Sequence, residues 1–293
     1  MTALDDLLAV VTLEPNGSDT FTGIGSANDG VEATFGGHFL AQATAAVSAT
    51  VDEGRLIHSL HGYFLRGGQP GRPYLLEVER TRDGRSFCTR RVRIAQDGLP
   101  SEGAKVQFEL TASFTVDADG PTFDAPSPVD FDSVPDPLSL PTYRELMTSH
   151  DVLPLPEDWA MRDYGLDIRT VNAPWAPDGP SEHGGIRLWV KADGTLPDDP
   201  NLHAAILAYQ SDESLADTVA MPWGATWGTP GVIFVSLDHA MWFHRRFDLN
   251  EWHFLDQRPL TVGNERGLAS ASVWNSSGTM VATVNQEALL RLE

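Results

Sequence analysis

The segment Ile57-His58-Ser59-Leu60-His61-Gly62-Tyr63-Phe64-Leu65-Arg66 returns near the end of the chain as Val235-Ser236-Leu237-Asp238-His239-Ala240-Met241-Trp242-Phe243-His244-Arg245. Each copy is followed by further strand-like runs. Phe108 lies 50 residues after His58, and Gln286 lies 50 residues after Ser236. An internal repeat on this scale indicates a duplicated structural unit. The contact between two such units is where we expect a site.

Both halves of the chain predict one long helix and a series of strands. Small and apolar residues predict buried helices over 37–51 and 200–212. Alternating apolar runs predict strands at 56–65, 74–82, 87–95, 105–114, 167–171, 185–190, 231–245, 251–260, 266–274 and 280–290. The sequence therefore predicts an α+β double hot-dog fold, in which each of two tandem domains wraps a curved antiparallel sheet around a helix.

A stretch rich in proline and acidic residues separates the two halves. Prolines recur at positions 121, 126, 128, 135, 137 and 141, a pattern typical of an extended linker. We therefore expect an N-terminal hot-dog domain over 1–116, a linker over 117–145 and a C-terminal hot-dog domain over 146–293.

Composition limits the partners of this chain of 293 residues. Its formal net charge of −21 disfavours nucleic acid and anionic membranes, because both need a basic surface. The single cysteine, Cys88, allows no intrachain disulfide and no cysteine metal cage, and we expect it to be a small core residue. No signal peptide or membrane-spanning run is recognisable, so we expect a soluble cytoplasmic protein.

Three polar residues stand in otherwise apolar elements of the C-terminal half. Asp212 ends an apolar helix, where burial would raise its pKa, while Ser236 and Gln286 lie in strands and need hydrogen-bonding partners. Together they could hold one water, with Asp212 accepting its proton and the other two fixing its direction. This arrangement predicts a hydrolase without a covalent nucleophile.

Other catalytic motifs are absent from the sequence. There is no Gly-x-Ser-x-Gly elbow, no His-Glu-x-x-His and no phosphate-binding Gly-x-x-x-x-Gly-Lys-Ser/Thr loop. The nine histidines are scattered, and His58 and His61 share one strand face only if a bulge intervenes. We therefore expect no metal site.

Several motifs in the same order resemble the type II acyl-CoA thioesterases, the TesB-like family with a double hot-dog fold. They are Phe35-Gly36-Gly37, His58-Ser59-Leu60-His61, Tyr63-Phe64-Leu65-Arg66, Arg82-Asp83-Gly84-Arg85-Ser86-Phe87, Arg90-Arg91-Val92, Thr111-Ala112-Ser113-Phe114, Ser211-Asp212, Asp238-His239-Ala240-Met241-Trp242-Phe243-His244 and Leu249-Asn250-Glu251-Trp252. The likeness covers nearly the whole chain. It implies hydrolysis of fatty acyl-CoA to free acid and CoA, with no cofactor beyond the CoA of the substrate.

The resemblance also assigns roles to residues. The catalytic Asp, hydroxyl and Gln of the family fall on Asp212, Ser236 and Gln286. Backbone N–H groups at Gly37 and His38 are candidates for stabilising the oxyanion, and His58 for contacting the substrate. Candidates for binding the CoA phosphates are Arg82, Arg85, Arg245 and Arg246.

Two other functions remain open at this stage. The segment Asp198-Asp199-Pro200-Asn201-Leu202-His203 superficially resembles the Asp and His pair of hot-dog enoyl-CoA hydratases, and a non-catalytic acyl-CoA-binding protein would keep the pocket without turnover. From the family we also expect a homodimer or a higher homo-oligomer. Acyl chain length, pathway and regulation are not predicted.

Overall fold

The computed structural model describes residues 2–25, 33–149, 164–172, 184–225 and 229–292. The N-terminal half contains α1 (Ala3–Val11), β1 (Glu14–Gly17), β2 (Thr20–Gly23), α2 (Gly36–Ser48), β3 (Arg55–Phe64), β4 (Tyr74–Asp83), β5 (Phe87–Ala95) and β6 (Val106–Val116). The rest contains α3 (Tyr143–Ser149), β7 (Leu166–Asn172), β8 (Arg187–Ala192), α5 (Pro200–Ser211), β9 (Val232–Ser236), β10 (Asp238–Phe243), β11 (His253–Gly263), β12 (Arg266–Asn275) and β13 (Met280–Leu292). Short 3-10 turns lie at Pro100–Glu102, Pro137–Ser139, Asp217–Val219 and Met221–Trp223.

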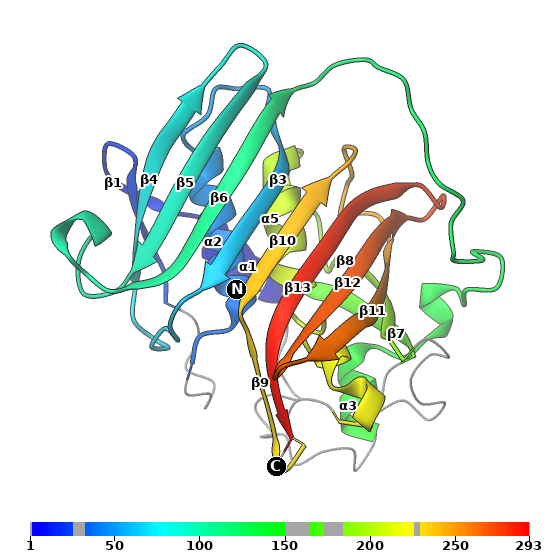
Figure 1. Cartoon of the computed structure of the whole chain (residues 1–293). Helices are drawn as coiled ribbons and strands as arrows, with labels where there is room; N and C mark the ends of the chain where they lie inside the picture. Colours follow the sequence, from blue (N-terminus) through cyan, green and yellow to red (C-terminus); the bar gives the residue numbers. More distant parts are fainter. Residues whose placement is uncertain (1, 26–32, 150–163, 173–183, 226–228, 293) are drawn as a thin grey trace.

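The strands form one sheet with the same order on either side of its centre (Figure 1). From the central pair β3 and β10, the order outward is β6, β5, β4, β2 and β1 on one side and β13, β12, β11, β8 and β7 on the other. β9 pairs with β13 beside this path. The repeated sequence segments are thus neighbours, antiparallel about the pair Gly62 and His239. Two equivalent halves joined edge to edge confirm the double hot-dog fold.

The two long helices, α2 and α5, lie together against one face of this sheet (Figure 1). They run in opposite directions. At one end Gly37, near the start of α2, approaches the carbonyl of Tyr209, near the end of α5. At the other end, Asn201 near the start of α5 donates to the Arg55 carbonyl at 2.8 Å and accepts from the Ile57 N–H at 3.0 Å. Because both helices pack against sheet and against each other, they share one apolar core.

The strand predicted over 231–245 is wrong as a single strand, because it breaks at Leu237. Ser236 pairs with Ala288 and Ala240 pairs with Asn285, so three residues on one strand face two on the other. The extra residue forms a bulge. At the bulge the Asp238 carboxylate accepts the Glu287 N–H at 2.8 Å, in place of a backbone carbonyl.

Other differences from the predicted elements are at their ends, at the N-terminus and at α3, a helix that we did not predict and that begins inside the linker expected over 117–145. The first helix ends at Ser48 and not at residue 51. We did not predict α1, although Thr2 and Asp5 form a capping box at its start. We also missed β1 and β2, where Glu14–Gly17 is exposed throughout and shows no alternation. The short length of these strands explains the omission.

Three further expectations concern the linker, the cysteine and the membrane. Residues 117–136 contain no helix or strand, while the domain boundaries themselves remain predictions. Cys88 is 1% exposed in the core, as expected. Among the described residues, no helix is long and apolar enough to cross a membrane.

Candidate active site

The structure brings Asp212, Ser236 and Gln286 together. Asp212 is the C-cap of α5, Ser236 ends β9 and Gln286 lies on β13. The side-chain nitrogen of Gln286 donates to Oδ1 of Asp212 at 2.7 Å and to Oγ of Ser236 at 2.7 Å. The partner that Ser236 needed is therefore Gln286, and one amide joins all three side chains.

The carboxyl group of Asp212 is almost completely withdrawn from water. The residue is 7% exposed, and this burial raises its pKa from 3.8 to about 7. Hydrogen bonds from Gln286 and from the backbone of Gly37 oppose the shift without cancelling it. At neutral pH the carboxylate is therefore poised to accept a proton.

Two glycines allow the start of α2 to approach this carboxylate. A Cβ on Gly36 would lie 2.4 Å from Oδ2 of Asp212 and 2.8 Å from the Phe64 ring. A Cβ on Gly37 would lie 2.3 Å from the Tyr209 carbonyl. Any larger residue at either position would separate the two halves of the site.

The oxyanion candidates Gly37 and His38 are engaged within the protein. The N–H of Gly37 hydrogen-bonds to the Asp212 carboxylate, and the N–H of His38 donates to the Phe35 carbonyl at 3.1 Å. The imidazole of His38 is buried, with Nε2 2.9 Å from the Ile24 carbonyl oxygen. These contacts give no support to an oxyanion role for either residue, which stays a prediction.

The substrate candidate His58 lies away from Asp212, near the other end of α5. A bulge does occur at His58, where Ile57 and Ser59 face consecutive residues of β6. Nε2 of His58 is 2.8 Å from the Ser113 hydroxyl, and His58 lines a cavity beside Asn201. Since α5 rises 1.5 Å per residue, Asn201 and Asp212 are about 17 Å apart along the helix.

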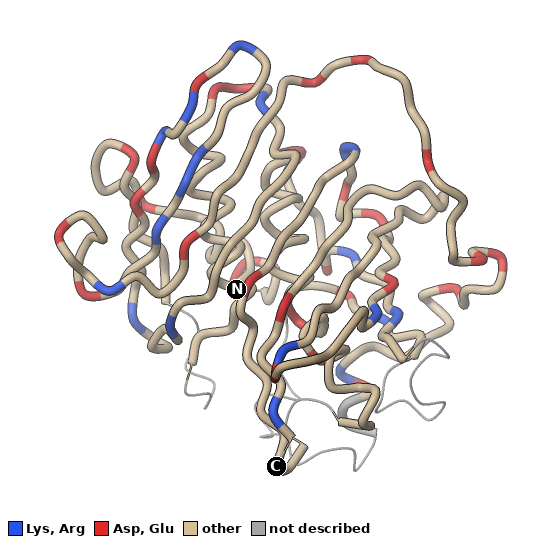
Figure 2. Tube along the Cα trace, in the orientation of Figure 1, with Lys and Arg blue, Asp and Glu red and all other residues tan. Residues whose placement is uncertain are grey.

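The four candidate arginines gather at this same far end. Basic positions mark the tip of the β4–β5 hairpin and the segment after β10 (Figure 2). The hairpin of Arg82 and Arg85 is tied to this end because the Arg55 guanidinium donates to the carbonyls of Gly84 and Arg85, at 2.8 and 3.3 Å. Arg245 pairs with Asp124 at 2.8 Å and Arg246 with Asp117 at 3.2 Å.

Arg245 and Arg246 also border the cavity that His58 lines, which has a volume of about 280 Å³. Its other walls are mainly apolar, including Phe243 and Phe247. In the repeat, His58 on this cavity stands where Ser236 stands beside Asp212 in the other half. The C-cap of α2 is Ala49, where α5 has Asp212, and the acid that lines the cavity, Asp117, is paired with Arg246.

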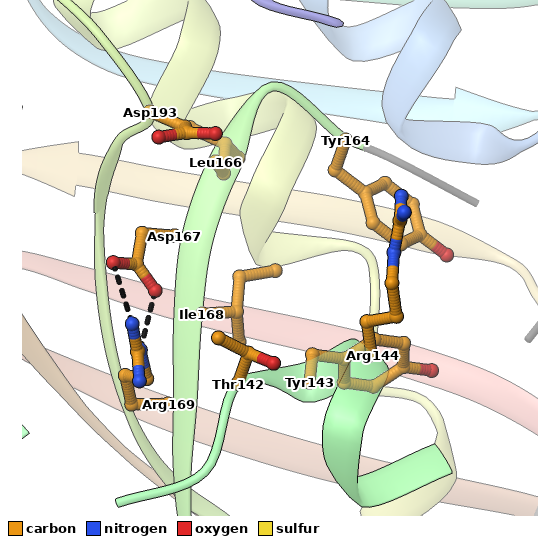
Figure 3. A pocket seen from close by; sticks show the side chains of 9 residues that line it. All are labelled: Thr142, Tyr143, Arg144, Tyr164, Leu166, Asp167, Ile168, Arg169 and Asp193. Atoms are coloured by element: carbon orange, nitrogen blue, oxygen red, sulfur yellow. Dashed lines mark hydrogen bonds and ion pairs between the residues drawn. The ribbon is translucent and has the colours of Figure 1, made fainter. Parts of the chain in front are cut away.

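A separate hollow of about 240 Å³ lies between α3 and β7 (Figure 3). The charges of Asp167 and Arg169 are paired within it, with Nε to Oδ1 at 2.5 Å and Nη2 to Oδ2 at 3.1 Å. None of the predicted site residues lines it. We therefore assign no chemistry to this hollow.

Sequence reasoning missed one residue beside Asp212. His239 is fully buried, with Nδ1 3.8 Å from Oδ1 of Asp212 and Nε2 2.9 Å from the Ser211 hydroxyl. Burial lowers its pKa to about 4, so the ring is neutral at physiological pH. The sequence feature that could have identified His239 is its place in the repeated segment, three residues after Ser236.

Known proteins with related sequences share one description. The family described as acyl-CoA thioesterase matches residues 178–289, and its N-terminal domain family matches residues 25–115. Acyl-coenzyme A thioesterase 8 of Rattus norvegicus is 31% identical over 97% of this chain and 88% of its own length. Acyl-CoA thioesterase 2 of Haemophilus influenzae is 30% identical and covers 98% of both chains.

Solved structures agree. An acyl-CoA thioesterase II from Mycobacterium marinum superposes with a TM-score of 0.75 at 32% identity, covering 98% of both chains. A hot-dog protein of unknown function from Alicyclobacillus acidocaldarius has a TM-score of 0.77 at 18% identity, covering 100% of this chain and 99% of its own, and supports the fold alone.

Proposed function

Since the chain belongs to the acyl-CoA thioesterase family and is a thioester hydrolase, we propose that it cleaves fatty acyl-CoA by direct attack of a water molecule. The products are a free fatty acid and CoA. One observation carries this proposal: a buried carboxylate with a pKa of about 7 is joined by one amide to a hydroxyl group. Among the described residues the Ser236 hydroxyl contacts only the Gln286 amide, which cannot take its proton, so water is the nucleophile that Asp212 can activate.

In this reaction Asp212 acts as the general base. It takes a proton from water while the water oxygen bonds to the thioester carbonyl carbon. When the tetrahedral intermediate collapses, the carbon–sulfur bond breaks and the Asp212 proton passes to the sulfur of CoA. The hydroxyl of Ser236 keeps its own proton after accepting from Gln286, so it is free to orient the attacking water.

Gln286 acts through the other two residues. Both hydrogens of its amide are used, one on Asp212 and one on Ser236, so none is left to donate to water. Its role is to fix the distance and direction between base and hydroxyl. This positioning limits the freedom of the reacting groups before the chemical step.

For the CoA nucleotide we propose the basic end of the molecule. Arg82, Arg85, Arg245 and Arg246 supply guanidinium groups, which suit phosphate, on a chain of strongly negative charge. With the thioester at Asp212, the pantetheine arm would have to run along α5, about 17 Å from Asp212 to Asn201, to reach the cavity that Arg245 and Arg246 border. The ion pairs of Arg245 and Arg246 with aspartates would have to open.

The hydratase alternative is not favoured by the contacts of His203. Its Nε2 lies 3.0 Å from the Pro197 carbonyl and its Nδ1 accepts the Leu249 N–H at 3.0 Å. Both ring nitrogens are thus bonded inside the protein. The neighbouring Asp199 caps α5 through the Asn201 and Leu202 N–H groups.

A single-turnover experiment in H₂¹⁸O tests the proposal. Direct attack places ¹⁸O in the first molecule of fatty acid released and leaves the peptide that contains Asp212 unlabelled. Attack by Asp212 itself would form a mixed anhydride, which hydroxylamine traps on the Asp212 peptide and which places ¹⁸O in that peptide when water attacks the aspartyl carbonyl; either signal in mass spectrometry would overturn the mechanism. Absence of thiol release with any acyl-CoA, despite binding, would instead favour the non-catalytic binding protein.

Two further properties stay predictions. We propose a homodimer or higher homo-oligomer, to be measured by light scattering, because exposed aromatic residues such as Tyr63 and Trp242 lie on the central strands. We also keep the cytoplasmic assignment as a proposal. A relative from Saccharomyces cerevisiae, 25% identical over 98% of this chain, is named a peroxisomal acyl-coenzyme A thioester hydrolase, so fractionation must decide the compartment.

A further inference from the structure

The buried imidazole of His239 has no function in the mechanism above. It lies on β10 directly opposite Gly62, at the centre of the sheet, and none of its surface is exposed. Two polar groups beside it are the Ser211 hydroxyl, 2.9 Å from Nε2, and the Asp212 carboxylate, 3.8 Å from Nδ1. A buried polar ring at this position needs an explanation.

The surroundings of the ring determine which nitrogen carries the proton. Nδ1 faces the Asp212 carboxylate, and a lone pair there would be repelled by the negative charge. Nδ1 is therefore the protonated nitrogen of the neutral ring. Nε2 must then accept the Ser211 hydroxyl proton, and this contact is shorter than the 3.1 Å from that hydroxyl to the Ala208 carbonyl.

Gln286 offers the matching acceptor. Its amide nitrogen serves Asp212 and Ser236, while its Oε1 is buried and has no other hydrogen bond among the described residues. Nδ1 of His239 is likewise buried without a hydrogen bond there. Burial lowers the pKa of His239, and the Gln286 side chain opposes that shift, as an acceptor facing a ring N–H does.

We propose that His239 is a positioning residue, which donates its Nδ1–H to Oε1 of Gln286 and so holds the amide nitrogen toward Asp212 and Ser236. This inference rests on the proposed function. In the resulting chain of hydrogen bonds, Ser211 donates to His239, His239 donates to Gln286 and Gln286 donates to Asp212. Without the imidazole the Gln286 amide can turn over, which would place its oxygen against the carboxylate.

Two amide substitutions separate this role from simple packing. In His239→Asn the side-chain nitrogen can take the place of Nδ1, whereas in His239→Gln it reaches the place of Nε2 near Ser211. We expect His239→Asn to keep kcat within about threefold of wild type. In His239→Gln we expect kcat to fall about 10- to 100-fold, the effect of losing a hydrogen bond to a charged group, with KM within about threefold.

The pH profile gives a readout that a purely structural role would not change. A turned Gln286 amide raises the pKa of Asp212, so the acid limb of kcat/KM should move upward by about one pH unit in His239→Gln and stay in place in His239→Asn. If His239→Gln and His239→Asn had the same kcat and the same acid limb of kcat/KM, the inference would be overturned.

Two controls complete the design. The turnover of Asp212→Asn is measured in the same experiment. If this variant keeps turnover, the proposed function fails, whatever the His239 variants do. If it is inactive, the His239 variants test the inference by themselves. Should the variants fail to fold, NMR of ¹⁵N-histidine in the wild-type enzyme reports the tautomer directly. Protonation of His239 on Nδ1 supports the inference and protonation on Nε2 refutes it.

Discussion

Replacing Asp212 by asparagine should abolish thiol release and, at alkaline pH, stabilise the folded protein. The two effects have one cause, the burial of a carboxyl group that must ionise to act as a base. Its pKa is about 7 in the folded protein and 3.8 when burial is lost. Asparagine has nearly the same shape and no charge to bury.

The magnitude comes from this difference in pKa. The contribution of the protonated group to stability is fully present below pH 3.8 and is lost as the pH rises through about 7. At about 1.4 kcal/mol per pH unit, the whole loss is about 4 kcal/mol, of which about 3 kcal/mol falls between pH 5 and pH 9. Asparagine at position 212 does not ionise, so the Asp212→Asn variant does not lose this stability as the pH rises.

Urea denaturation of the wild-type protein and of Asp212→Asn, from pH 5 to pH 9, measures this loss of stability. The free energy of unfolding of Asp212→Asn, relative to wild type, should rise by about 3 kcal/mol across this range. Asp199→Asn, at the other end of the same helix, keeps an oxygen to cap α5 and should retain wild-type turnover. Parallel curves for wild type and Asp212→Asn would refute the reasoning, because Asp212 would then not titrate in the range assigned to it.

Three other changes test the site. Because Asp212 must lose its proton, kcat/KM of the wild-type enzyme should fall about tenfold per pH unit below about pH 7, and a flat profile down to pH 5 would contradict the general-base role. Gly36→Ala pushes against the carboxylate and should lower kcat/KM about 100-fold. Gly37→Ala meets the Tyr209 carbonyl and displaces the N–H that bonds Asp212, so it should lower kcat/KM and also reduce stability in urea by about 1–3 kcal/mol. Arg245→Ala with Arg246→Ala should raise KM for acyl-CoA but not for acyl-pantetheine, which lacks the nucleotide; an equal rise for both would remove these arginines from CoA binding.

The sequence was informative where a residue conflicted with its surroundings. Asp212, Ser236 and Gln286 are polar residues in apolar elements, and such residues need partners when buried. The repeat also predicted two equivalent halves. Neither argument used three-dimensional contacts, so both could be made from the order of residues alone.

The geometry that depends on strand register could not be predicted in this way. In a regular strand Ser236 and His239 would point to opposite faces, and only the bulge at Leu237, which reverses the facing of the residues after it, brings His239 to the side of Ser236. Nor could the sequence place His58, Arg245 and Arg246 at one cavity beside Asn201, about 17 Å along α5 from Asp212, because that arrangement depends on how α5 packs against the strands.

The close approach of α2 to the end of α5 has a consequence for how the protein could be used. The base and its partners come from the C-terminal half, while the N–H that supports the base comes from Gly37 in the N-terminal half. Cutting the exposed stretch over 117–126 would leave neither fragment with a complete centre. Thioesterase turnover by the two pieces would then be a colorimetric reporter of their reunion, and the chain would serve as a split enzyme.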